Sequence, residues 1–477
     1  MNARPGWELV APLAVCVLLA GWIALYVANA QAPGFSILAF VIANQIVYTD
    51  ALDFLLRLYM RRRHAAGVVE FQTSDPRNDI SVDLGAIVSP DRRLVMPASP
   101  YAIIASIYNL EDQVEQFIEA FKPYRDRVWL VSDASTDNTV LRLTQAGWRC
   151  FDDGINRRKP GAIRRLLERI PRHIETIIVI DPDVRIRGLR DGSVIDLNRF
   201  VSDFQQSKAA AACPRIMIEP DGWLARFQAF EYALSFCAGR RSLADFSVTS
   251  GCSIYRRSAL TRALNEHSLS VYAEDLENAV ILLSQGERIY YDGRLVVSTE
   301  GPGSVARWFS QRVGWYQGLL KVYLERFPEV LRISRRSPFA AYHYLIYTGG
   351  LSIALHLIRV VSAAALALSL LSGVDAFLFD SVISRQYFNP EFFAAAMGSY
   401  LGLGVIVLFT SVPKTDRAYA APIVPLYLCY AIVHVVPITL GFANYFALKY
   451  FRRRIYQDHY ETAVGLGVVT QKLEFPT

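Results

Sequence analysis

Long apolar runs stand at both ends of the chain, and a more polar stretch lies between them. Residues 7–30 are apolar apart from Glu8 and Asn29, and the run has about the length that the hydrocarbon core of a bilayer requires. A second run at 34–59 leads into the basic block Arg-Arg-Arg-His at 61–64. Because positively charged loops stay in the cytoplasm, these patterns predict two transmembrane helices within residues 1–64 and a cytoplasmic segment after them.

The C-terminal third has the same apolar character. Three more runs are long enough to span a membrane, at residues 342–371, 392–412 and 421–448. Pro425 and Pro437 are expected to interrupt the last run. The pattern predicts about three transmembrane helices in residues 341–450 and a tail at 451–477. Three spans after a cytoplasmic domain put this tail outside, whereas the arginines at 452–454 favour the cytoplasm, so both orientations stay open.

Between the apolar ends, short β-rich runs alternate with helix-like stretches, which is the pattern of an α/β sheet. Strands are expected at residues 101–106, 128–131 and 176–180, and helices at 111–121 and 139–145. Strand–helix–strand units build parallel sheets that bind ligands at the carboxyl ends of their strands, so we expect a parallel sheet here. The pattern predicts one cytoplasmic domain at residues 65–300 and amphipathic interfacial helices at 301–340.

Composition limits the classes of function. Hydrophobic residues make up 52% of the 477 residues and charged residues 20%, so a large water-facing part accompanies the apolar segments. The net charge of +6 comes from 50 basic and 44 acidic residues, a balance that argues against nucleic-acid binding. The six cysteines are scattered, with no CxxC and no paired Cys/His spacing. Neither a disulfide framework nor a zinc site is therefore expected.

Acidic residues directly follow two of the predicted strands. Asp133 lies in a Ser/Thr/Asp-rich turn, where its carboxylate can accept hydrogen bonds from a nucleobase or ribose, although the turn equally fits a helix cap. Asp181 and Asp183 follow the strand at 176–180 and can converge on one divalent cation that neutralises a diphosphate. An ordinary polar loop is the competing interpretation of this pair.

Three more charged side chains stand at the starts of helical stretches. Lys159 precedes one helix, where a cation suits a diphosphate and a solvated basic loop is the alternative. Glu274 and Asp275 precede an apolar helix, and acidic residues favour that position for dipole reasons alone. One of them can also remove the proton of an acceptor hydroxyl. Such a base and a metal-stabilised leaving group suffice for a direct displacement.

A segment rich in aromatic and polar side chains follows, containing Gln311, Arg312 and Trp315. Trp315 can stack on a sugar ring, and the other two can bind phosphate or hydroxyl groups. The same residue types are also typical of an amphipathic helix at a bilayer surface. Both roles fit one helix.

Together and in this order, these motifs resemble the processive membrane glycosyltransferases of family 2, which include the chitin, cellulose and hyaluronan synthases. The resemblance runs from about residue 103 to residue 318. It implies a GT-A nucleotide-diphospho-sugar transferase domain of α/β fold. This domain would be joined through interfacial helices to an all-α transmembrane bundle.

The resemblance also implies roles for individual residues. Asp275 would be the catalytic base, with Glu274 beside it, and the metal would bind Asp181 and Asp183. The donor would be bound by Tyr108, Asp133, Lys159, Asp181, Gln311, Arg312 and Trp315. The acceptor would be bound by Thr249, Ser250, Gly251, Glu231 and Trp315.

Two positions depart from the family pattern. Gly314 stands where the Gln-x-x-Arg-Trp motif usually has arginine, and Thr249 stands where relatives often carry cysteine. Arg312 offers a charge near Gly314, but on a helix it points about 200° away from that position. The departure at Gly314 bears on the donor-phosphate contacts and on processivity.

The activity that the resemblance implies is an inverting transfer of sugar from a nucleotide-diphosphate donor, in the first place a UDP-sugar, with Mg²⁺ or Mn²⁺. The acceptor would be a growing polysaccharide, exported through the protein's own channel. The protein would lie in the inner or plasma membrane, in contact with the lipid bilayer, with its catalytic domain in the cytoplasm. Because the tail is short, regulation would need a partner.

Two other functions remain open from the sequence. A single-addition enzyme would transfer one sugar to a lipid-linked acceptor such as ceramide or polyprenyl phosphate. A transporter or scaffold could instead carry a transferase domain that has lost its activity. The intact acidic motifs at 181–183 and 274–275 argue against this second alternative.

Overall fold

The computed structural model describes residues 53, 56–57, 99–188, 193, 195–219, 221–268, 272–354, 356, 398, 401–402, 404–410, 412 and 417–456. The first predicted transmembrane run, nearly all of the second, residues 61–98, most of the run at 342–371 and much of the run at 392–412 lie outside these residues.

The described part of the chain forms an eight-stranded sheet in the order β3-β2-β1-β4-β7-β6-β8-β5. Its strands are β1 Tyr101–Ile107, β2 Val128–Ser132, β3 Cys150–Phe151, β4 Thr176–Ile180, β5 Arg185–Ile186, β6 Ala211–Ile218, β7 Cys252–Arg256 and β8 Ile289–Thr299. The first four strands in this order are parallel. β7 is antiparallel to both β4 and β6, β5 is antiparallel to β8, and β6 and β8 are parallel. The α/β prediction is confirmed, but the expected parallel sheet is mixed.

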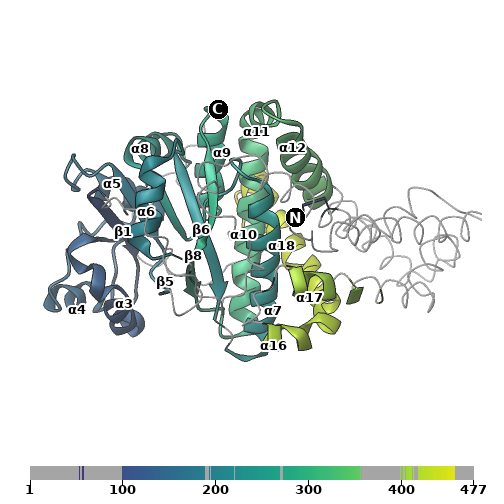
Figure 1. Ribbon diagram of the computed structural model, residues 1–477, viewed down its shortest axis with the longest axis horizontal. Helices are drawn as coiled ribbons and strands as arrows, with labels where there is room; N and C mark the ends of the chain where they lie inside the picture. The colour runs from purple at the N-terminus through teal and green to yellow at the C-terminus, as the bar shows by residue number, and fades with distance from the viewer. Residues whose placement is uncertain are drawn as a thin grey trace, which may run out of the picture.

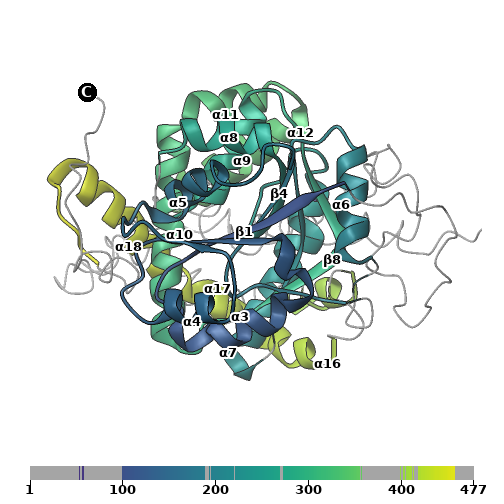
Figure 2. The same ribbon diagram turned by 90° about the vertical axis from the view of Figure 1, so that its left-hand side faces the viewer.

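Helices cover both faces of the sheet. Those of the α/β part are α3 Val114–Phe121, α4 Thr139–Gln145, α5 Arg158–Leu167, α6 Leu197–Gln206, α7 Gly222–Ala233, α8 Arg257–Glu266 and α9 Glu274–Ser284. Short 3₁₀ segments, Glu111–Gln113 and Lys122–Arg127, flank α3, and a π-helical segment, Leu234–Arg240, continues α7. In Figure 2, α5, α8 and α9 lie above β1, and α3 and α4 lie below it.

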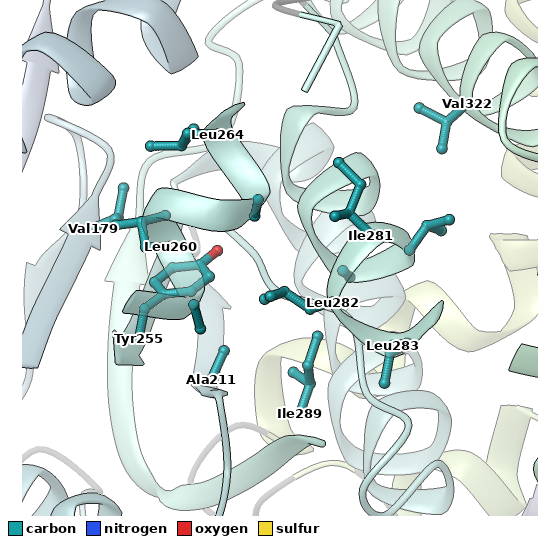
Figure 3. Packing of buried hydrophobic residues seen from close by; sticks show 14 of the residues in the cluster. Val179, Ala211, Tyr255, Leu260, Leu264, Ile281, Leu282, Leu283, Ile289 and Val322 are labelled. Carbon is teal, nitrogen blue, oxygen red and sulfur yellow. The ribbon is translucent and has the colours of Figure 1, made fainter. Parts of the chain in front are cut away.

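Burial on both faces follows from the nearly unbroken apolar strands. In β1, Ala102 and Ile104 face the core that α5, α8 and α9 cover, whereas Ile103 and Ala105 face the core that α3 and α6 cover. Alternate residues of a strand point to opposite faces, so a strand buried on both sides is apolar throughout. Figure 3 shows the first core, where α9 packs beside β7 and α8.

A second group of helices follows the sheet. It comprises α10 Val305–Glu325, α11 Phe327–Ser334, α12 Pro338–Ala341, the π-helical segment Tyr342–Ala354, α16 Arg417–Ala420, the 3₁₀ segment Ala421–Leu426, α17 Tyr427–Val433, α18 Val435–Phe446 and the π-helical segment Ala447–Phe451. Figure 1 shows α10 and α18 side by side, with α16 and α17 near one end of α10 and α11 and α12 near the other. Ser304 caps α10 by accepting a hydrogen bond from the Arg307 amide.

Among the described residues, every helix is too short or too polar to cross a bilayer. The predicted run at 421–448 is divided into a 3₁₀ segment and two short α-helices. Pro425 lies inside the 3₁₀ segment and Pro437 in the first turn of α18. Pro437 is compatible with its position, because proline is tolerated in the first turn of a helix. Pro425 is the residue before the last one of the 3₁₀ segment, next to the break that precedes α17.

Candidate active site

Asp181 is held at the end of β4 by the antiparallel strand beside it. The Asp181 amide donates to the carbonyl of Gly251 (2.7 Å), the residue before β7. A Cβ added at Gly251 would lie 2.2 Å from Oδ2 of Asp181, so the Asp181 carboxylate would have to move to accommodate it. Gly251, which we predicted to bind the acceptor, therefore makes room for the Asp181 carboxylate.

Lys159 connects Asp181 to the acidic start of α9. Its Nζ lies 2.6 Å from Oδ1 of Asp181 and 2.7 Å from Oε1 of Glu274. Burial opposes the charge on Lys159, but Asp181, Glu274 and Asp275 raise its pKa well above the usual value. Lys159 is thus a fixed cation among three carboxylates that come from two distant parts of the sequence.

Both Asp181 and Asp275 hold a proton more tightly than an exposed aspartate. The pKa of Asp181 is raised to about 7, chiefly by burial and also by Asp183, Asp275 and Glu274, against the opposing effect of Lys159. The pKa of Asp275 is raised to about 6, again chiefly by burial, with Lys159 and Arg240 acting to lower it. A carboxylate with a pKa near neutrality is suited to general-base catalysis.

The backbone around Asp275 is tied to the strand ends. Thr249 donates its hydroxyl to the Asp275 carbonyl (2.7 Å), so this predicted acceptor residue orients the start of α9. The Ser250 hydroxyl bonds to the Cys252 carbonyl (3.3 Å) within the same turn. Arg240 donates to the carbonyls of Val248 and Thr249, which places its charge close to Asp275.

Asp183 points toward the end of β8. Its Oδ2 accepts a hydrogen bond from the Thr299 hydroxyl. Asp183 is also close enough to Asp181 to raise the pKa of that residue. The two carboxylates therefore belong to one cluster, as their spacing predicts.

Asp133 forms a second polar centre at the end of β2. Its Oδ1 accepts a hydrogen bond from the Arg157 amide (2.5 Å), and its carbonyl accepts one from the Asn156 side chain (2.9 Å). Burial raises the Asp133 pKa, and the amides of Arg157 and Arg158 lower it. Tyr108 lies close enough that Asp133 contributes to the rise in its pKa, after burial.

The α10 residues form a network with α7 and α17. Arg312, only 3% exposed, makes two hydrogen bonds to the Glu231 carboxylate (2.6 and 2.8 Å). The Tyr430 hydroxyl donates to the same carboxylate (2.8 Å). The Arg312 guanidinium also lies 4.4 Å from the ring centroid of Trp315. A predicted donor residue and a predicted acceptor residue are thus paired with each other, and the charge of Arg312 is compensated by Glu231.

Tyr232 lies between this network and the carboxylate cluster. Burial raises its pKa, and Arg312, Glu231 and Asp183 all act on it electrostatically. The buried Oε1 of Gln311 has no hydrogen-bond partner among the described residues. Trp315 is 37% exposed, so part of its ring can be reached from outside.

The structure thus brings five predicted residues into one cluster: Lys159, Asp181, Asp183, Glu274 and Asp275. Asp133 and Tyr108 form the second centre, and Glu231, Arg312 and Trp315 the third. Sequence reasoning missed Arg240 and Thr299. A polar residue at the end of a long apolar strand was the available signal for Thr299, whereas no local pattern marks Arg240.

The carboxylate pair has the donor chemistry that a divalent cation needs. Hard cations such as Mg²⁺ and Mn²⁺ prefer carboxylate oxygens, and Mg²⁺ is typically held by one or two carboxylates plus substrate phosphates. In the described part of the chain, no group of three or more His, Cys, Asp or Glu side chains is arranged to hold a metal. Asp181 and Asp183 would therefore bind the cation together with ligands from the donor.

Residues 176–383 match the family model described as glycosyl transferase family group 2. The matched stretch starts at β4 and includes Asp181, Asp183, Asp275 and the segment around Trp315. This match supports a glycosyltransferase of family 2. A search of curated proteins found no match.

Solved structures show distant similarity. A mannosyltransferase from Pyrobaculum calidifontis, in complex with GDP-Man and Mn²⁺, is 17% identical over 81% of this chain and 97% of its own, with a TM-score of 0.45. Glucosyl-3-phosphoglycerate synthase from Mycobacterium tuberculosis is 15% identical over 47% of this chain and 79% of its own, with a TM-score of 0.31. Similarity at this level carries no conclusion about substrate.

Proposed function

We propose that this protein is an inverting glycosyltransferase that transfers sugar from a nucleotide-diphosphate donor to a growing polysaccharide. The observation that carries the proposal is the convergence of Asp181 and Asp275 on Lys159, with Asp183 beside Asp181. A transferase of this class needs a site for the diphosphate and a base for the acceptor hydroxyl. This cluster offers both within one set of contacts.

Each centre has a distinct task in the proposed reaction. Asp133 and Tyr108 bind the nucleoside of the donor, and Lys159 and Arg240 place positive charge beside the diphosphate and the base. Asp275 accepts the proton of the acceptor hydroxyl as its oxygen attacks the anomeric carbon. The bond from that carbon to the diphosphate breaks at the same time, so the carbon is inverted by a single displacement.

Asp181 and Asp183 would hold Mg²⁺ or Mn²⁺. When bound, this ion neutralises negative charge that accumulates on the departing diphosphate. The Mn²⁺ in the similar mannosyltransferase structure is consistent with this cofactor, although the expectation rests on the carboxylates of this chain.

We further propose that the enzyme is an integral membrane protein with a cytoplasmic catalytic domain and that its product leaves through the membrane. The apolar runs at both ends of the chain and the basic block at 61–64 support this location. Exposed aromatic and apolar side chains beside arginines 452–454 fit a surface in contact with lipid headgroups; they are Tyr450, Phe451 and Ile455.

The direct test is incubation of the purified full chain in lipid vesicles with a panel of nucleotide sugars and either Mg²⁺ or Mn²⁺. We expect one donor to be consumed and a polymer to accumulate, with linkage analysis showing inversion. Asp275→Asn removes the base but keeps the shape of the side chain, and it should lower transfer at least ~100-fold. Unchanged transfer in this variant would contradict the assignment of the base.

Product length separates the polymer from the single-addition alternative. Gly314 stands where the polysaccharide synthases that this chain resembles have arginine. Because of this difference, transfer of a single sugar to a lipid acceptor remains an alternative function. Mass spectrometry that finds only single-sugar adducts, with ceramide or polyprenyl phosphate as acceptor, would favour the lipid enzyme. The assignments of the base and the metal site would then still hold, but the proposal of a polymeric product would be wrong.

A further inference from the structure

Two glycines one turn apart in α10, Gly314 and Gly318, form a notch on the helix surface. A Cβ added at Gly314 would lie 2.4 Å from Cε1 and 2.6 Å from Cζ of Tyr272. A Cβ added at Gly318 would lie 2.7 Å from the Cβ of Ala273 and 2.8 Å from the Tyr272 carbonyl carbon. The ring of Tyr272 and the backbone after it therefore fill space that any other residue at these positions would occupy.

Glycine weakens a helix interior, so two of them in one helix are explained by this close approach. A neighbouring face of α10 is equally constrained. A Cβ at Gly441 of α18 would lie 2.6 Å from the Val313 carbonyl oxygen and 2.9 Å from the Gln317 amide nitrogen. This close contact with α18 restricts movement of α10 and so limits how far the helix can shift to admit a larger side chain in the notch.

The segment in the notch leads directly into the acidic start of α9. Ala273 has a left-handed backbone (φ +59°), a conformation that a residue with a Cβ adopts only when its surroundings hold it there. Its carbonyl accepts the hydrogen bond from the Glu277 amide that begins the helix (2.9 Å). Glu274 and Asp275 follow at once, so the position of Tyr272–Ala273 sets the position of both carboxylates.

We propose that the notch of Gly314 and Gly318 is a positioning device for the catalytic base. It fixes Tyr272 and Ala273, and through them it sets the distance of Asp275 from Lys159 and Arg240. The inference rests on the proposed function, since it assigns a role to the same site. It also explains the departure at position 314, because an arginine there would run into the Tyr272 ring.

Substitutions in the notch test this role. Gly314→Ala should displace Tyr272 and lower kcat by about 10- to 100-fold, since misplacement of about 1 Å has that effect on a reacting group. The donor KM should stay within about twofold because Asp133 is untouched. The apparent pKa of the acidic limb of the kcat profile should also shift, since Asp275 moves relative to its cationic neighbours. A purely structural role for the notch would not move this limb.

The matched control is Gly303→Ala, because a Cβ at Gly303 meets nothing within 4 Å. We expect this variant to keep the kcat, the pH profile and the melting temperature of the wild type. Tyr272→Ala combined with Gly314→Ala should be no less active than Tyr272→Ala alone, since the methyl group then has no ring to displace. The melting temperatures should follow the same pattern: the double variant should lose less stability than the sum of the losses of the two single variants. This measurement does not depend on enzyme activity.

Ala273→Gly covers the case in which Gly314→Ala fails to fold. Glycine accepts the left-handed backbone without strain, so this variant should fold. It loses the contact between the Ala273 side chain and Gly318. We therefore expect kcat to fall and the acidic limb of the kcat–pH profile to shift. If wild-type protein transfers no sugar from any donor, the proposed function fails. If it is active and both Gly314→Ala and Ala273→Gly keep its kcat and pH profile, the positioning role alone is wrong.

Discussion

Lys159 is the residue on which the electrostatics of the cluster depend most. It contacts Asp181 and Glu274 directly and lowers the pKa of both Asp181 and Asp275. A lysine at the start of a helix gives no sign in the sequence that it joins Asp181 to a carboxylate 115 positions away, because only the sheet order brings them together.

The pH dependence of the reaction follows from Asp275. Its pKa of about 6 in the folded protein means that the base becomes competent as pH rises through that value. We expect kcat/KM to rise with pH and to be half-maximal near pH ~6, measured with saturating Mn²⁺. Lys159→Met removes a neighbouring positive charge and should move this limb to higher pH. A flat profile between about pH 5 and 8 would exclude Asp275 as the titrating base.

Gly251 supports the proposed metal site by being small. Gly251→Ala would force the Asp181 carboxylate away, since its Cβ would lie within 2.2 Å of Oδ2. We expect the Mn²⁺ concentration needed for half-maximal activity to rise about 10- to 100-fold, the range typical when the support of a metal ligand is lost. Gly188→Ala is the matched control, because a Cβ at Gly188 has no neighbour within 4 Å, and its metal requirement should match that of the wild type.

At the scale of elements, the buried ion pair between α7 and α10 is a structural link. Glu231→Gln leaves the Arg312 guanidinium buried without its counter-charge, which should cost roughly 2–4 kcal/mol of unfolding free energy and lower Tm by several degrees. The exposed pair of Lys122 and Glu119 offers a control, and Glu119→Gln should change stability by less than about 0.5 kcal/mol. Thermal denaturation in detergent measures both. Loss of transfer at an unchanged Tm would instead favour the predicted contact of Glu231 with acceptor.

The sequence predicts elements well where burial makes a local pattern. The strands at 128–131 and 176–180 and the helix at 139–145 agree with β2, β4 and α4 to within a residue, because apolar runs ended by polar turns are local features. The antiparallel β7 was not predicted. Its pairing between β4 and β6 depends on contacts far apart in the chain, which no short window contains.

At the scale of the whole molecule, the carboxylate cluster links protons to stability. Burial raises the pKa of both Asp181 and Asp275 above that of an unfolded chain, so the folded state binds protons more tightly. Their contribution is therefore greatest below pH ~4 and is lost as pH rises through about 6 to 7. A divalent cation competes with these protons.

We therefore expect Mn²⁺ to raise the melting temperature more at about pH 7.5 than at about pH 5, since ionised carboxylates are the ligands. Differential scanning fluorimetry of the full chain without donor measures this difference. The variant Asp181→Asn should lose most of the Mn²⁺ effect at the higher pH. An equal effect at both pH values would place the metal on groups other than this cluster.

The sheet order also has a consequence for local unfolding of the protein. The sheet divides into two sets of four strands, β3-β2-β1-β4 and β7-β6-β8-β5. Asp133 and Asp181 lie at strand ends of the first set, and Thr249 and Thr299 lie near strand ends of the second. In the sheet, the two sets are joined by the pairing of β4 with β7, which we call the seam. Local opening of this seam would separate Asp133 and Asp181 from Thr249 and Thr299 before either half of the sheet unfolds. Amide protons along that seam would then report on the integrity of the whole catalytic centre.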